Sequence, residues 1–159
     1  MTKKILIIEN DPRIAEALDR RLRSRGYVPV VVNDQGDALK AFESERPDLV
    51  IISLTLEENG GVETCRAFRG LPLGALVPIL LLGTGQEMIS TVPEAIAIGA
   101  DHFFLKPKAL GELLAKVLTY IGPGTGLDLN TDDSSTDFQL AGAQFDGDAD
   151  GDYLYVCMR

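Results

Sequence analysis

Short, unbroken runs of aliphatic and β-branched residues constrain the fold of this chain more than any other feature of its sequence. The run at residues 49–52 follows a proline and an aspartate and ends at Ser53. A strand that is apolar at every position is typical of a parallel sheet covered on both faces, whereas a half-exposed strand alternates apolar and polar residues. We therefore predict a central parallel strand over residues 48–53, with Ser53 at its carboxyl end.

Four further apolar segments are predicted as strands, and helical patterns separate them. The predicted strands cover residues 4–8, 27–32, 48–53, 79–82 and 102–105, and the predicted helices begin near residues 12, 34, 62, 91 and 110. Five strands that alternate with five helices indicate an α/β fold: an open parallel sheet with right-handed crossovers.

Such a sheet places its binding site beyond the carboxyl ends of the strands, where the strand order reverses. The residues at those ends are Glu9, Asn10, Asp11, Ser53, Gly83, Thr84 and Lys106. The sequence therefore predicts a small crevice in which one lysine faces one to three acids.

These strand ends and their surroundings resemble the receiver domains of two-component response regulators. The matching segments are residues 3–12, 47–56, 61–66, 78–82, 99–101 and 106–107, so the resemblance covers about residues 3–121. It implies a doubly wound, flavodoxin-like sheet with strand order 2-1-3-4-5 and five helices. We expect a receiver-like domain over residues 1–121, followed by a Gly- and Asp-rich tail or linker over residues 122–159.

The resemblance also implies a set of site residues. A working receiver ends its first strand with two acids that help to hold Mg²⁺, and its third strand with an aspartate that accepts a phosphoryl group. A threonine or serine ends its fourth strand, a lysine ends its fifth, and an aromatic residue is coupled to that hydroxyl. In this chain the positions fall, in the same order, on Glu9, Asn10, Ser53, Gly83, Lys106 and Phe103. Only the first acid, the lysine and the aromatic residue are retained.

The three departures from the family pattern, Asn10, Ser53 and Gly83, all make phosphorylation less favourable. Mg²⁺ prefers several hard oxygen ligands, usually including carboxylates, but Asn10 and Ser53 are both uncharged. A serine hydroxyl needs a base before it can accept a phosphoryl group, and His102 is the only histidine in the chain. Gly83 has no hydroxyl. We therefore predict a pseudo-receiver that is independent of phosphorylation, with neither enzymatic activity nor a cofactor.

The resemblance further implies that protein partners bind the face formed by the fourth helix, fifth strand and fifth helix. By analogy, the setting would be bacterial signalling, motility or polarity.

The alternative function is a receiver still regulated by phosphate, through Ser53 or a neighbouring acid. For Lys106 and Glu9 we favour a structural ion pair over a remnant catalytic site. Thr84 is not expected to replace the missing hydroxyl of Gly83, because a shift of one residue points the side chain the other way.

Charge is distributed unevenly along the chain. Residues 1–121 hold 16 acidic and 14 basic residues, whereas residues 122–159 hold eight aspartates and one arginine, which gives −2 and −7 of the total of −9. No basic stripe indicates a nucleic-acid partner. The apolar runs are too short for membrane insertion, and no signal peptide is recognised, so a cytoplasmic location is expected. Cys65 falls in a helical pattern and is expected to be a buried thiol.

The tail opens with a Gly- and Pro-rich linker at residues 122–126, and residues 138–145 and 153–158 are candidate strands of a hairpin. Between them Asp146, Asp148, Asp150 and Asp152 resemble the start of a calcium loop. The twelfth position of that loop would be Cys157 instead of glutamate, and no second helix follows. A calcium-binding appendage is therefore a third hypothesis, beside an acidic turn or a linker to a further C-terminal domain.

Overall fold

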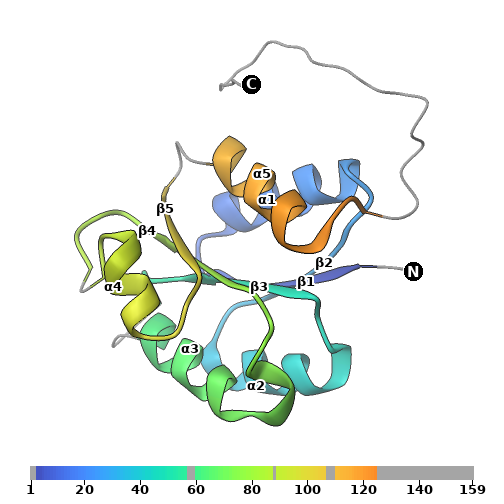
Figure 1. Cartoon of the computed structure of the whole chain (residues 1–159). Helices are drawn as coiled ribbons and strands as arrows, with labels where there is room; N and C mark the ends of the chain where they lie inside the picture. Colours follow the sequence, from blue (N-terminus) through green and yellow to red (C-terminus); the bar gives the residue numbers. More distant parts are fainter. Residues whose placement is uncertain (1–2, 57–59, 88, 107–109, 125–159) are drawn as a thin grey trace.

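The computed structural model describes residues 3–56, 60–87, 89–106 and 110–124 of the 159-residue chain. Its centre is one parallel sheet with strand order β2-β1-β3-β4-β5 (Figure 1). The strands are β1 (Lys4–Ile8), β2 (Val28–Val32), β3 (Leu49–Ser53), β4 (Ile79–Gly83) and β5 (His102–Leu105). The doubly wound sheet and its order are confirmed.

Five helices cover the two faces of the sheet. They are α1 (Pro12–Ser24), α2 (Gln35–Glu45), α3 (Gly60–Gly70), α4 (Val92–Ala97) and α5 (Leu110–Ile121). Figure 1 shows α1 and α5 on one face and α2 and α3 on the other, with α4 beside β5 at the edge of the sheet. A short 3-10 helix, η2 (Pro72–Gly74), lies in the connection from α3 to β4. None of the helices in the described ranges is long and apolar enough to cross a membrane.

The helix starts follow the local chemistry of the sequence. Asp11 caps α1 by accepting a hydrogen bond from the amide of Arg13, and the proline after it occupies the first turn. Thr91 and Glu94 form a reciprocal capping box at the start of α4. Gly26, with φ of 87°, follows α1 in the left-handed region that glycine tolerates best. These signals placed α1 and α4 within about one residue of their observed starts.

The core consists of two apolar layers, one on each face of the sheet. Every residue of β3 and β4 is buried, as the unbroken apolar runs predict. Along β3, Leu49 and Ile51 pack toward α1 and α5, whereas Val50 and Ile52 pack toward α2, α3 and α4. Full burial of one such side chain contributes roughly 1.5–3 kcal/mol, so β3 anchors both layers. Its carboxyl end is thereby fixed at the edge where the site is expected.

Several predictions need adjustment or fall outside the described residues. The third helix begins at Gly60, two residues before its predicted start, and β2 begins at Val28 instead of residue 27. The candidate hairpin and the candidate calcium run lie in residues 125–159, outside the described ranges.

Candidate functional site

The ends of β1, β3 and β5 bring a single ammonium group into contact with three side chains. Parallel pairing sets Ile8 opposite Ile52, so the residues that follow these strands meet at one edge. Lys106 Nζ lies 2.9 Å from Glu9 Oε1, 2.7 Å from Ser53 Oγ and 2.8 Å from Thr55 Oγ1. An ammonium has three protons to donate, and these three groups can accept them all.

Glu9 is the acid of this cluster, and its side chain is fully buried. Its Oε2 lies 3.1 Å from Lys106 Nζ and accepts a hydrogen bond of 2.9 Å from the Asp11 amide. Among the described residues, Oε1 is held by its ion pair with Lys106 and makes no hydrogen bond besides. A carboxylate so far from water requires a counter-charge. The ion pair expected between these two residues is present.

Thr55 is a member of the site that sequence reasoning missed. Its hydroxyl lies 2.7 Å from Ser53 Oγ and donates a hydrogen bond of 3.2 Å to Asn10 Oδ1. Asn10 Nδ2 in turn donates to the Thr55 carbonyl, also at 3.2 Å. The available signal was spacing, because a residue two positions beyond a strand end points the same way as the end residue.

Of the acids predicted to line the crevice, only Glu9 faces Lys106 among the described residues. Asp11 does not face Lys106, because its carboxylate caps α1 and lies 3.4 Å from the Arg13 guanidinium. Hydrogen bonds from the Arg13 side chain and amide lower the pKa of Asp11. The sequence predicted that one to three acids face Lys106, and in the described residues one does, Glu9.

The residues present do not fit a divalent cation. The Glu9 carboxylate is already paired with an ammonium, and the Asn10 side-chain oxygen accepts from Thr55. Within the described part of the chain, no group of three or more His, Cys, Asp or Glu side chains could hold a metal ion. Mg²⁺ would thus meet a positive charge and only one carboxylate where it requires several oxygen ligands.

At the end of β4, the space for a hydroxyl side chain is filled. A Cβ atom built on Gly83 would lie 2.8 Å from Phe103 Cε1 and 3.1 Å from Leu54 Cδ1. The Phe103 ring is buried in this position. A threonine or serine at residue 83 would therefore require the ring to move.

Thr84, the residue after Gly83, bonds within the loop that follows β4. It is exposed, and its hydroxyl and amide donate to the Glu87 carboxylate at 2.5 and 2.8 Å. Partial burial acts to raise the pKa of Glu87, but these hydrogen bonds outweigh it and the pKa is lowered. The side chain of Thr84 is thus engaged with Glu87 in the loop after β4.

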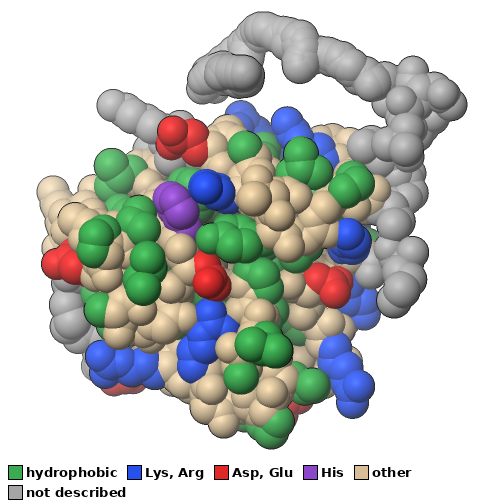
Figure 2. Space-filling view, in the orientation of Figure 1, with side chains coloured by type: hydrophobic (Ala, Val, Ile, Leu, Met, Phe, Trp, Pro, Cys, Tyr) green, Lys and Arg blue, Asp and Glu red, His purple; other side chains and the backbone are tan. Residues whose placement is uncertain are grey.

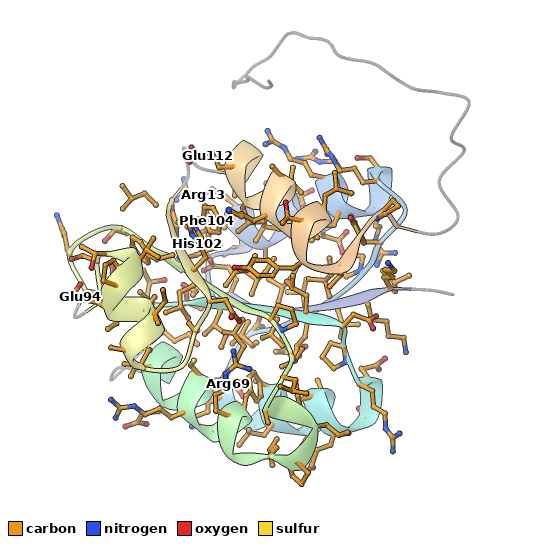
Figure 3. The ribbon with its side chains drawn as sticks, viewed as in Figure 1. Arg13, Arg69, Glu94, His102, Phe104 and Glu112 are labelled. Carbon is orange, nitrogen blue, oxygen red and sulfur yellow. The ribbon has the colours of Figure 1, made fainter. Side chains whose placement is uncertain are left out.

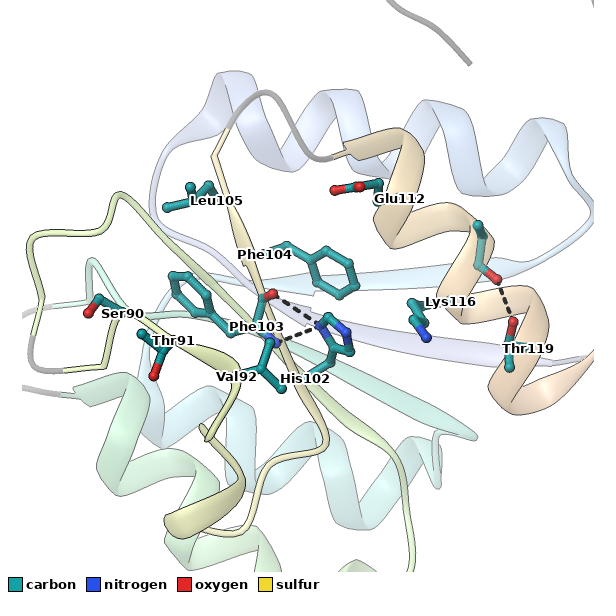
Figure 4. Close-up of a pocket in the computed structure, with 11 residues that line it drawn as sticks. Ser90, Thr91, Val92, His102, Phe103, Phe104, Leu105, Glu112, Lys116 and Thr119 are labelled. Carbon is teal, nitrogen blue, oxygen red and sulfur yellow. Dashed lines mark hydrogen bonds between the residues drawn. The ribbon is translucent and has the colours of Figure 1, made fainter. Parts of the chain in front are cut away.

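A separate hollow of about 610 Å³ lies over α4, β5 and α5 (Figure 4). His102 and Phe104 stack in it with ring centroids 4.5 Å apart, between Val92 on one side and Lys116 on the other. Figure 3 shows the stacked pair between the two helices, with Glu94 on α4 and Glu112 on α5. The His102 ring bonds to the backbone of Phe103, so it is engaged away from Ser53.

Comparison with known families gives one match over most of the described chain. Residues 5–118 match the response regulator receiver domain. Response regulator MprA of Mycobacterium tuberculosis is 35% identical over 117 residues, which are 74% of this chain and 50% of that protein. The DNA-binding response regulator MtrA of Mycolicibacterium smegmatis matches with the same identity and coverage. The chain thus spans about half the length of the curated relatives it matches.

Solved structures share the same fold. The BeF3-activated receiver domain of Klebsiella pneumoniae RstA superposes with a TM-score of 0.65 at 26% identity, covering 74% of this chain and 97% of that one. Chemotaxis protein CheY4 of Vibrio cholerae superposes with a TM-score of 0.69 at 24% identity, covering 76% of this chain and all of that one. The second likeness concerns the fold alone.

Proposed function

The chain belongs to the response regulator receiver domain family, and from this premise we propose that it is a pseudo-receiver, independent of phosphorylation, that works by binding protein partners. The observation that carries the proposal is the position of Lys106. Its ammonium contacts Glu9, Ser53 and Thr55 at once, where a phosphorylated receiver would need a metal ion and an acceptor carboxylate. The crevice thus lies at the same strand ends as in the family, but a lysine ion pair and two hydroxyls take the place that the metal ion and the acceptor carboxylate would need.

Ser53 is a poor substitute for an acceptor aspartate. The residue is fully buried, and its Oγ accepts hydrogen bonds from Lys106 Nζ and from the Thr55 amide. A nucleophilic hydroxyl needs a neighbouring base to remove its proton, but an ammonium that donates to it cannot act as one. Regulation through Ser53 is therefore the weaker alternative, and calcium binding by Asp146–Asp152 stays a prediction from the sequence.

The proposed partner surface is the α4-β5-α5 face. Large apolar side chains are exposed on all three elements: Ile96 on α4, Leu105 on β5 and Leu118 on α5. The hollow around His102 and Phe104 lies on the same face, and Figure 2 shows hydrophobic side chains around the histidine with charged side chains among them. Protein interfaces commonly combine apolar and polar side chains in this way. A cytoplasmic protein of bacterial signalling, motility or polarity is the partner class we propose, by analogy with similar receivers.

The test is a titration of the protein with Mg²⁺ and beryllofluoride, a phosphoryl mimic, followed by amide NMR. We expect no saturable shifts at Ser53, Gly83 or Lys106, because the site lacks the carboxylates that would hold the metal. The matched control is the double variant Asn10→Asp, Ser53→Asp, which should show saturable shifts with Mg²⁺. Saturable shifts in the unmodified protein would contradict the proposal.

A further inference from the structure

The second half of α1 presents a basic surface. Residues 19–25 hold four arginines and one aspartate. Arg20, Arg23 and Arg25 are exposed and Arg21 is half-buried, whereas Leu18 and Leu22 of the same segment are buried. Arg23 is paired with Asp19 at 3.1 Å. Arg20 and Arg21 have no carboxylate within ion-pair distance among the described residues. We call Arg20, Arg21, Arg23 and Arg25 the α1 basic surface.

The chain leaves the described domain next to this surface. The Tyr27 hydroxyl donates a hydrogen bond of 2.6 Å to the Gly122 carbonyl, and the Lys3 ammonium donates to the Ile121 carbonyl. Gly124 packs so closely against the chain after α1 that an added Cβ would lie 2.5 Å from the Arg25 carbonyl oxygen. Figure 1 shows the end of α5 beside α1. The described chain therefore ends, at Gly124, against the backbone of the residues that follow α1.

The segment that starts there carries the opposite charge. Residues 125–159 contain eight aspartates and one arginine, and the first four aspartates are Asp128, Asp132, Asp133 and Asp137. The seven residues 19–25, six of them in α1, span only about 10 Å along the helix axis. A chain advances up to ~3.3 Å per residue, so Asp128 to Asp137 can reach every arginine of the surface.

We propose that residues 128–137 dock on the α1 basic surface and cover it through charge pairing. Individual exposed pairs are weak and are screened by salt, but the tether keeps the two partners at a high effective concentration. The segment acts as an intramolecular acidic cover that competes with any acidic partner for α1. The proposal uses no residue of the Lys106 crevice or of the α4-β5-α5 face, so it stands or falls independently of the pseudo-receiver function.

Paramagnetic broadening in the full-length chain tests the proposal. A nitroxide is attached at position 134 in a Ser134→Cys, Cys157→Ser chain. Cys65 escapes labelling because it is fully buried, and burial raises the pKa of its thiol to about 11. The matched control carries the same label with Asp128, Asp132, Asp133 and Asp137 all replaced by Asn, so that tether length is unchanged.

At low salt we expect amide signals at residues 20–23 to broaden at least about twofold more with the Asp segment than with the Asn segment. The difference should vanish in about 0.5 M NaCl, because the Debye length shrinks to a few ångströms. Arg20→Gln with Arg21→Gln should remove it, whereas Arg66→Gln on the exposed side of α3 should not. Equal broadening with the Asp and Asn segments at low salt would overturn the proposal.

Discussion

Lys106 joins the ends of three strands, because its ammonium lies between a buried carboxylate and two hydroxyls. Its side chain is only 7% exposed, so solvent does little to stabilise the charge. Ser53 and Thr55 are uncharged, so Glu9 alone balances the charge of the lysine, and the pair is electrically neutral.

We expect Lys106→Met to destabilise the protein by about 3–5 kcal/mol, because it leaves Glu9 buried without a counter-charge. Chemical denaturation measures the loss. The control is the double variant Glu9→Gln, Lys106→Met, which removes both charges and should lose less than the single Lys106→Met change. A double variant as unstable as the sum of the two single changes would show that the pair contributes no coupling.

At the scale of elements, the side chain of Arg69 fastens α3 to three neighbouring segments. Its guanidinium donates to the carbonyls of Gly99, Gly74 and Val77 at 2.6, 2.8 and 2.5 Å. It also pairs at 3.0 Å with Asp101, whose carboxylate accepts from the Ile79 amide as well. Arg69 thereby links η2, the start of β4 and the turn before β5. Figure 3 shows it projecting from α3 toward the sheet.

Replacement of Arg69 by lysine should destabilise the protein by about 1–3 kcal/mol, since one ammonium cannot satisfy three carbonyls and a carboxylate in different directions. Urea denaturation of the two proteins gives the difference in the free energy of unfolding. The matched control is Arg66→Lys, at an exposed position of the same helix, which should change stability by less than about 0.5 kcal/mol. Equal effects of the two substitutions would argue against a linking role for Arg69.

On the scale of the whole molecule, the two ends of the described domain are tied together. The hydroxyl of Tyr27, the residue before β2, donates to the carbonyl of Gly122 after α5, and Lys3 before β1 donates to the carbonyl of the last residue of the same helix. Burial raises the pKa of Tyr27, although the charge of Arg25 acts in the opposite direction. The folded state therefore favours the protonated phenol, which is the form that can donate this hydrogen bond.

A raised pKa makes stability depend on pH at the alkaline end. The contribution of Tyr27 should be fully present below the ordinary phenol pKa of 10.0 and be lost as pH rises through the higher folded value. Tyr27→Phe should lower the free energy of unfolding by about 1 kcal/mol at neutral pH. The variant should also lose less stability than the unmodified protein as the pH is raised. Unfolding free energies at neutral and alkaline pH measure both effects. Burial raises the pKa of Tyr120 as well, but this side chain is more exposed, so the control Tyr120→Phe should remove less of the alkaline loss of stability than Tyr27→Phe.

The sequence alone determined the number, type and approximate limits of the strands and helices. Apolar runs, caps such as Asp11 and Thr91, and terminators such as Gly26 act within a few residues, so local physics is enough to locate them. Strand order came from the family resemblance, because periodicity does not say which strands are neighbours. The identities of Glu9 and Lys106 as facing charges followed from their places at strand ends.

Only the tertiary structure decided what the side chains at those ends contact. It brought Thr55 into the Lys106 cluster, turned Asp11 toward Arg13, and placed the Phe103 ring over Gly83. It also made Arg69 a link between segments. These contacts join residues up to about a hundred positions apart, and they depend on strand register and on the direction of each side chain. Both are set by packing of the whole core, which no local pattern in the sequence encodes.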